Sequence, residues 1–301
     1  DRYDADAVKA RLAMMTPENA RIWYISPNEP HNKTAYFVDA PYQVDKISAQ
    51  TFADWQKKSG EIALKLPELN PYIPDDFSLT KTTQDYPHPA LIVDEPTLRV
   101  VYTPSRYFAS EPKADVSVVL RNPKAMNSAK NQVMFALNDY LAGIALDQLS
   151  NQAAVGGISF STNANNGLML NANGYTQRLP QLFQALLEGY FSYTPTEEQL
   201  EQAKSWYAQM MDSAEKGKAY DLALMPAQML SQVPYFQRED RRALLPSITL
   251  KDVLAYRDAL KTNTRPEFLI VGNMSEDQAK TLAENVRTQL GSKGDEWCRN
   301  Q

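Results

Sequence analysis

Proline places the strongest constraint on this 301-residue chain, because prolines recur throughout residues 46–97. Each proline fixes φ and removes a backbone donor, so regular helix or sheet in this segment must be short. One helical piece is expected at residues 48–64, and the remainder is expected to be extended. Its leucine, isoleucine, phenylalanine and tyrosine residues predict that it lies against protein. The prolines stand at Pro67, Pro71, Pro74, Pro87, Pro89 and Pro96.

A helix–turn–strand pattern occurs on both sides of this segment. Residues 4–15 have apolar residues at helical spacing, and residues 20–26 are rich in strand formers. Near the C-terminus a helix is expected at 249–261, a turn in the sequence TRPE, a strand at 268–273 and a further helix at 275–290. The repeat predicts two related domains, and too little chain precedes the first copy to complete one.

The elements expected after residue 97 belong to one compact domain. Strands at 98–104 and 114–122 are expected to pair with each other. The other expected elements are a helix at 127–154 that Gly143 could break, strands at 158–163 and 168–173, and helices at 179–191, 196–216 and 219–232. Because strands and helices occur in separate runs, the predicted fold class is α+β, an antiparallel sheet packed on helices.

Four segments are predicted from these patterns. They are a C-terminal tail of a preceding domain (1–45), a proline-rich connector (46–97), a complete repeat domain (98–291) and the start of a linker to a missing domain (292–301). The chain begins at Asp1 rather than at methionine, and we interpret it as a piece of a longer protein.

The overall composition excludes several classes of partner. A net charge of −5 and a pI near 5.3 argue against a nucleic-acid partner. No apolar run approaches the roughly 20 residues that a membrane span needs, and no signal peptide is visible. The single cysteine, Cys298, cannot form an internal disulfide or a thiolate metal cluster.

Most candidate sites favour a structural interpretation. Gly156 and Gly157 follow a helix, so they lie at its carbonyl end, which repels phosphate. The two histidines, His31 and His88, lie in separate turn-rich segments, and neither H-E-x-x-H nor H-x-x-E-H occurs. The mixed-charge segment 237–246 is interpreted as a solvated loop. Four methionines are interpreted as core residues, namely Met210, Met211, Met225 and Met229.

The strands at 158–163 and 168–173 provide the remaining candidate. Asn165, Asn166 and Gly167 between them are a hairpin signal. Alternation directs Ile158, Phe160 and Thr162 to one face. The other face carries no charge, whereas solvent-facing strands usually carry lysine and glutamate. This face therefore predicts the wall of an enclosed, water-filled space, with Ser159, Ser161, Asn163, Asn171 and Asn173 as candidate peptide-facing residues.

Several motifs in order resemble the pitrilysin and insulin-degrading-enzyme family of inverted zinc metallopeptidases. They are TPENARIWYIS, the connector LPELNPYIPDDFSL followed by YPHPALIVDEPTLRVVY, the sequence GGISFST, and the helix at 196–216. The resemblance covers almost the whole chain and is closest to the bacterial periplasmic branch of the family. It implies four related α+β domains in two bowl-like halves that enclose peptide substrates.

The resemblance also implies that this chain is catalytically silent. The zinc helix of the family carries H-x-x-E-H, and the matching segment here, residues 127–143, contains neither histidine nor glutamate. No catalytic or metal-binding residue is carried over. Zinc is expected in the parent enzyme and not in this chain, and the implied partners are the remaining domains and peptide substrates. In the active domain, the strand equivalent to ISFST holds substrate as an added strand; whether this copy does so stays open.

Three hypotheses follow. The first is a non-catalytic middle segment of a pitrilysin-like zinc protease, which shapes the substrate chamber and supports the other half. The second is a stand-alone binding or scaffold protein with the same fold and no enzyme activity. The third is a hydrolase that uses His88 as its general base.

Overall fold

The computed structural model divides the chain into two compact units, Asp1–Glu68 and Leu69–Gln301. This boundary falls inside the predicted connector 46–97, and the four predicted segments stay predictions. The helix expected at 219–232 lies almost wholly outside the described residues, as do the segment 292–301, Met225 and Met229. The described residues are 4–63, 65–66, 68–81, 86–122, 125–164, 167–216, 218, 220, 234–262 and 264–291.

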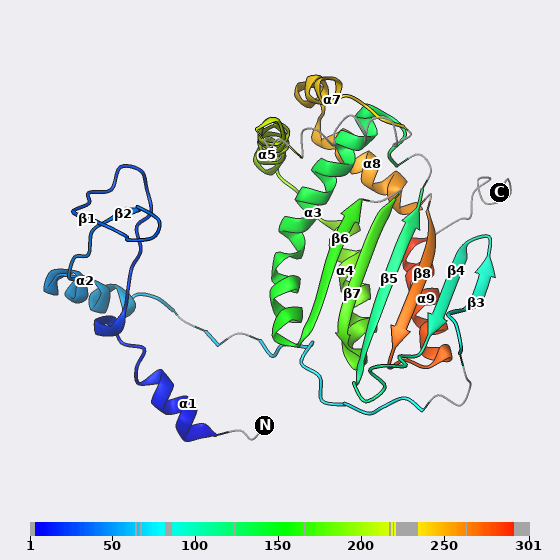
Figure 1. Ribbon diagram of the computed structural model, residues 1–301, viewed down its shortest axis with the longest axis horizontal. Coiled ribbons are helices and arrows are strands. Elements are labelled where there is room, and N and C mark those ends of the chain that lie inside the picture. Colours follow the sequence, from blue (N-terminus) through cyan, green and yellow to red (C-terminus); the bar gives the residue numbers. More distant parts are fainter. Residues whose placement is uncertain are drawn as a thin grey trace. The chain divides into compact units, whose positions relative to one another are not determined.

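The first unit contains two short helices and a minimal strand pair (Figure 1). Both helices begin at side-chain caps, Asp4 for α1 and Ser48 for α2, whose oxygens accept backbone N–H bonds of the first turn. Neither helix buries a residue, and both are shorter than the predicted 4–15 and 48–64. The elements are α1 (Ala5–Leu12), η1 (Pro17–Asn19), β1 (Lys33–Thr34), β2 (Pro41–Tyr42) and α2 (Ala49–Ser59).

The strand predicted at 20–26 is wrong. These residues are irregular, and Trp23 and Ile25 are 80% and 91% exposed. A strand forms only where its backbone groups pair with a neighbouring strand. In the described part of this unit, no strand pairs with residues 20–26. Apolar residues with strand propensity but no partner suit the tail of a domain, and that interpretation stays a prediction.

The second unit is built on a six-stranded sheet of order β3-β4-β8-β5-β7-β6. β4 and β8 pair in parallel, and the other neighbours pair antiparallel. The predicted fold class, a sheet packed on helices in an α+β arrangement, is confirmed. The strands are β3 (Ala90–Glu95), β4 (Leu98–Thr103), β5 (Lys113–Arg121), β6 (Ile158–Ala164), β7 (Leu168–Tyr175) and β8 (Arg265–Gly272).

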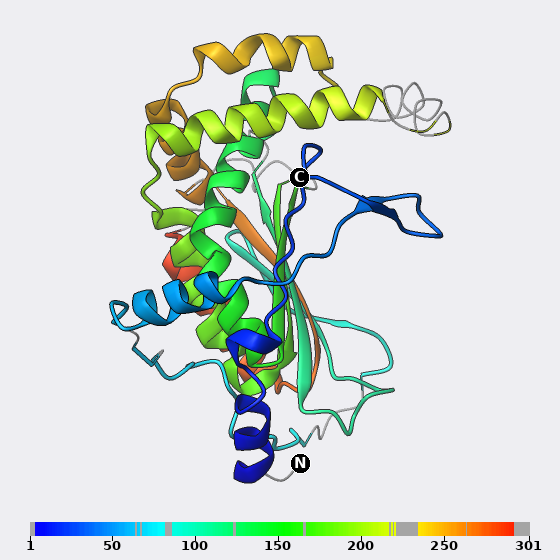
Figure 2. The same cartoon turned by 90° about the vertical axis from the view of Figure 1, so that its left-hand side faces the viewer.

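Helices cover one face of this sheet (Figures 1 and 2). Three of them, α3 (Ala129–Val155), α4 (Leu179–Ser192) and α9 (Glu276–Leu290), contact strands directly. The others pack on α3 or α4, namely α5 (Glu197–Glu215), α7 (Arg238–Leu244) and α8 (Leu250–Thr262), and short turns occur at η2 (Thr176–Arg178) and η3 (Leu245–Ser247). Alternate strand residues face the helices and form the core, among them Leu98, Val100, Val116, Val118, Leu168, Leu170, Phe268 and Ile270.

Helix boundaries in this unit follow local sequence signals. Thr196 and Gln199 form the predicted capping box of α5, and Ser275 caps α9 as predicted. Met211 is buried as predicted, whereas Met210 is 44% exposed. α3 runs through Gly143 without a break.

Two predicted sheet features are wrong, and both concern β8. This strand lies between β4 and β5, so residues 98–104 and 114–122 do not pair with each other. It also begins at Arg265, so TRPE is mostly strand rather than turn. Pro266 is tolerated there because it lies near the start of the strand, where a missing N–H costs little.

The prediction of an extended, proline-rich connector also missed strand β3. Residues 90–95, assigned to the connector, form an edge strand that pairs with β4. Pro96 lies in the two-residue turn between the two strands, where its fixed φ is favourable. The mixed-charge segment 237–246 is likewise helical in α7 rather than a loop.

Residues 69–81 begin the second unit, and side chains of other elements in that unit hold them in place. Gln177 Oε1 accepts hydrogen bonds from the backbone N–H groups of Asp75 and Asp76, at 2.9 and 3.1 Å. Asn273 accepts from the N–H of Thr80 and donates to the carbonyl of Ser78, at 2.6 and 3.0 Å. This part of the connector lies on protein, as predicted, although Leu69 at its start is 97% exposed.

Candidate functional site

The described helices of the second unit leave the second face of its six-stranded sheet uncovered (Figures 1 and 2), and we call it the open face. Its residues are the alternate strand positions that are not in the core. In the register, Asn173, Asp115 and Val271 form one row across β7, β5 and β8. The next rows are Asn171, Ser117 and Leu269, then Met169, Val119 and Glu267.

The predicted polar residues gather in one half of the open face, on β6 and β7. Ser159 lies opposite Asn173, Ser161 opposite Asn171, and Asn163 opposite Met169. Ser159 Oγ donates to Asn173 Oδ1 at 2.9 Å. The five candidate residues therefore share a face, which we call the neutral half: Ser159, Ser161, Asn163, Asn171 and Asn173. Their contact with peptide stays a prediction.

Strand β6 is the last strand of the sheet, and a partly buried carboxylate holds it. Asp139 Oδ1 on α3 accepts hydrogen bonds from Thr162 Oγ1 of β6 at 2.9 Å and from Tyr190 of α4 at 3.1 Å. Burial raises the pKa of the Asp139 carboxyl above its usual value, and the two donated hydrogen bonds oppose that rise. The inward direction predicted for Ile158, Phe160 and Thr162 is confirmed.

The glycine pair that precedes β6 ends α3, as predicted. Gly156 is the C-cap, and Gly157 has a φ of 73°, a conformation that favours glycine. A Cβ on Gly156 would lie 2.3 Å from the carbonyl oxygen of Tyr72, so this position also requires a residue without a side chain. The pair is therefore structural, and α3 directs its carbonyl end toward it.

A shallow hollow of about 360 Å³ lies at the centre of the open face. Its apolar lining comes mainly from Val101, Val119, Met169 and Leu269, which stand on four different strands. Arg99 and Glu267 border the hollow. Such a surface can accept an apolar side chain, with charged groups at one side to orient it.

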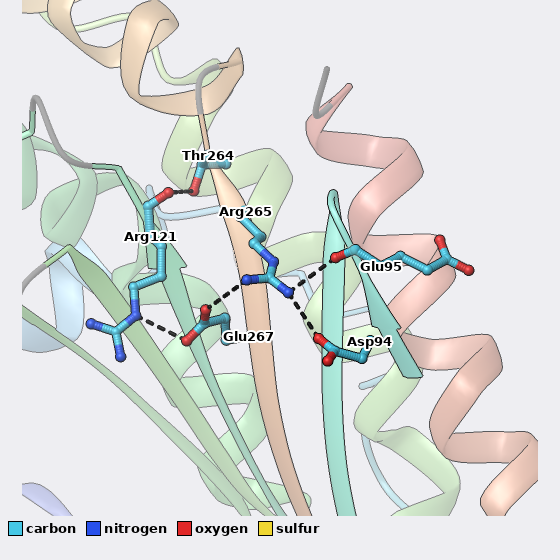
Figure 3. Close-up of polar contacts among 6 residues, drawn as sticks. All are labelled: Asp94, Glu95, Arg121, Thr264, Arg265 and Glu267. Carbon is cyan, nitrogen blue, oxygen red and sulfur yellow. Dashed lines mark hydrogen bonds and ion pairs between the residues drawn. The ribbon is translucent and has the colours of Figure 1, made fainter. Parts of the chain in front are cut away.

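Charged residues gather at the other end of the open face, across β3, β4, β8 and β5 (Figure 3). Arg265 is 18% exposed and donates to Asp94 Oδ1 at 3.1 Å, to the Glu95 carbonyl at 3.0 Å and to Glu267 Oε1 at 3.5 Å. Arg121 Nε donates to Glu267 Oε2 at 2.9 Å. We call the following set the charged half: Asp94, Arg99, Arg121, Arg265 and Glu267.

Sequence reasoning missed the charged half. Its residues come from four strands, and Asp94 and Arg265 are 171 positions apart. The assignment of TRPE to a turn concealed the only local signal, the alternation of Arg265 and Glu267 at strand spacing.

The histidines and the α3 helix do not form a metal site in the part of the chain that the structure describes. His31 and His88 are both exposed and lie in different units. No group of three histidine, cysteine, aspartate or glutamate residues among the described positions could hold a metal ion. On α3, Asp139 Oδ1 is engaged by two hydrogen bonds and Asn138 is fully buried, so this helix does not fit a zinc ion.

The geometry defines an α+β domain with an open sheet face and no metal-binding helix within the described residues, and the comparisons with known proteins identify its family. Residues 1–243 match the family described as the middle or third domain of peptidase M16. Protease 3 of Shigella flexneri and of Escherichia coli K12 are each 82% identical over 301 residues, covering 100% of this chain and 31% of each relative. A crystal structure of pitrilysin matches with a TM-score of 0.84 and 82% identity, covering 100% of this chain and 32% of that one.

The chain therefore belongs to the peptidase M16 family, as its middle or third domain. The resemblance predicted from sequence is confirmed. More distant relatives include the insulin-degrading enzyme of Drosophila melanogaster, 24% identical over 310 residues that cover 96% of this chain and 30% of the relative. The chain spans about a third of the length of these relatives. No helix among the described residues is long and apolar enough to cross a membrane.

Proposed function

We propose that this chain is the non-catalytic middle segment of a pitrilysin-type zinc metalloendopeptidase, where it forms part of the wall around peptide substrates and supports the other half. The match to the M16 middle domain supports this role, as does the 31% of each relative that the chain spans. The zinc and the catalytic residues would come from the remaining domains, because residues 127–143 contain no histidine or glutamate.

The uncharged neutral half of the open face is the observation that carries the chamber-wall role. Its serines and asparagines offer donors and acceptors to a peptide of any charge. Its edge strand β6 pairs with β7 on one side, and no other strand among the described residues pairs with its other side. A peptide could therefore pair with its other side as an added strand.

The test begins with this chain alone, measured for zinc by atomic absorption and for cleavage of a fluorogenic peptide. We expect neither stoichiometric zinc nor cleavage. Cleavage should appear when the segments encoded on both sides of the chain are co-expressed with it. Stoichiometric zinc together with cleavage by the chain alone would contradict the proposal.

Two further measurements separate the alternatives. Stop codons directly flanking the coding segment would favour the stand-alone scaffold, whereas an upstream H-x-x-E-H would favour the protease. Any activity of the complete protein that survives His88→Ala removes the third hypothesis, and the exposed position of His88 favours that outcome. We also propose a periplasmic location, which cell fractionation of the complete protein would test.

A further inference from the structure

The charged half of the open face has more arginine than carboxylate. Arg99, Arg121 and Arg265 lie there with Asp94 and Glu267 as their carboxylate neighbours. The side chain of Glu95 is directed away from this group and forms an ion pair with Arg287 of α9 at 2.9 Å. This end of the face is therefore positive by one charge, although the whole chain carries −5.

Only one of the three guanidinium nitrogens of Arg121 has a hydrogen-bond partner among the described residues. Its Nε donates to Glu267, while its two terminal nitrogens point away from that carboxylate (Figure 3). Among the described residues they have no hydrogen-bond acceptor, and the side chain is 36% exposed. Two parallel N–H groups at the end of a guanidinium match the two oxygens of a carboxylate.

Arg99 provides a second cation close by. It lies between Asp94 of β3 and Glu267 of β8 in the register, but Arg265 engages both of those carboxylates. Arg99 is exposed, and its side chain forms no hydrogen bond or ion pair within the part of the chain that the structure describes. It also borders the apolar hollow.

The hollow and the two arginines adjoin each other on the same face. Glu267 stands beside Val119 in one row, and Arg121 is two residues farther along β5 on the same side. A bound segment that places an apolar side chain over Met169 and Leu269 would bring its next residues toward Arg99 and Arg121.

We propose that this part of the open face is a binding subsite for acidic peptide segments, in which a carboxylate binds Arg121 and Arg99 and a neighbouring apolar side chain fills the hollow. The inference rests on the proposed function, because it makes the open face a surface for peptides. Charge complementarity selects the carboxylate, and the apolar floor selects a peptide over a free inorganic anion.

The experiment measures binding of two fluorescein-labelled octapeptides to this chain by fluorescence anisotropy. One peptide contains two leucines followed by two glutamates, and the other has glutamines in place of the glutamates. Wild type should bind the glutamate peptide about tenfold more tightly, and Arg121→Gln should remove most of that preference, because charge-assisted bidentate bonds are strong. Arg99→Gln should weaken binding about threefold, as expected of an exposed charge.

Two variants serve as matched controls. Arg121→Lys retains the charge but not the planar group, so it should bind with intermediate affinity. Lys251→Gln removes an exposed positive charge from α8, a helix on the far side of the sheet, and should leave both affinities unchanged. Arg99→Gln loses no interaction within the described residues, so it should unfold at the wild-type temperature.

Three outcomes would overturn the inference: equal affinity of wild type for the two peptides, no binding of either at millimolar concentration, or wild-type binding by both Arg121→Gln and Arg99→Gln. These outcomes leave the proposed function intact if co-expression restores cleavage. Failure of that co-expression, with the glutamate preference present, would instead contradict the proposed function alone.

Discussion

The two halves of the open face lie on one sheet but differ in chemistry and in how their edge strands are held. The neutral half carries serine and asparagine, and its edge strand β6 is bound through the partly buried Asp139. The charged half carries arginines and carboxylates, and Arg265 binds its edge strand β3 through an ion pair with Asp94 and a hydrogen bond to the Glu95 carbonyl, both exposed. The difference shows that a single sheet can carry an uncharged surface and a charged one within a few strand spacings.

The largest effect is expected from Arg265→Met. Methionine retains an aliphatic chain but removes the guanidinium group that links β8 to β3. Asp94 is 54% exposed, so its ion pair contributes little. The bond to Glu267 is partly buried, and its loss together with the bond to the Glu95 carbonyl should lower the free energy of unfolding by about 2 kcal/mol. Urea unfolding followed by circular dichroism measures this change.

The matched control in the neutral half is Ser161→Ala, at an exposed position whose side chain has no hydrogen bond within the described residues. It should change the free energy of unfolding by less than about 0.5 kcal/mol. Equal losses in the two variants would show that the two halves do not differ in how they are held.

Asp139→Asn is the next change, and its effect should depend on pH. Asparagine can accept the same hydrogen bonds at Oδ1 without a partly buried charge, so the variant should be more stable at pH 7, by no more than about 1 kcal/mol. Because folding raises the pKa of Asp139, its contribution is fully present below the unfolded value near 4 and is lost as pH rises through the folded value.

The pH effect is measured as the difference in free energy of unfolding between wild type and Asp139→Asn from pH 3 to pH 8. The difference removes the contributions of other carboxylates, including Glu276, whose pKa is lowered by Lys280 and Tyr86. A difference that does not change with pH would show that Asp139 is not perturbed by burial.

Lysine substitution tests the neutral half for contact with substrate. Replacing Ser159, Ser161 and Asn163 by lysine in the complete protein should change peptide affinity about threefold, by adding exposed charges to the face, and should leave zinc content unchanged. Glutamine at the same three positions is the control for size. If affinity for acidic and basic peptides is unaltered, the neutral half is a scaffold surface only.

Apart from the Ser161→Ala control, the smallest effect is expected from Ser159→Ala. It removes the hydrogen bond to Asn173, which is exposed to water, so the free energy of unfolding should fall by less than about 0.5 kcal/mol. The melting temperature measures this change. A loss of 2 kcal/mol would mean that the neutral half depends on its polar contacts as strongly as the charged half does.

Sequence reasoning predicted the neutral half but not the charged half, because the first depends on neighbouring residues and the second on residues far apart in the sequence. The alternation along residues 158–163 and 168–173 is visible within each strand, so it revealed which side chains share a face. The charged half depends on which strands are neighbours. Its arginines and carboxylates meet because β8 lies between β4 and β5, and the predicted pairing of β4 with β5 excluded that arrangement.

By itself, the sequence determined features that depend on a few neighbouring residues. These include the capping boxes at Thr196 and Ser275, the helix end at Gly156, the inward positions of β6 and β7, and the motifs that identify the family. Only the tertiary structure decided the strand order, the place of β3 at the sheet edge and the meeting of Arg265 with Asp94. Helix caps and strand alternation depend on residues a few positions apart. Strand order depends on contacts between distant segments, and no local pattern encodes the packing of those segments or the entropy of closing the loops between them.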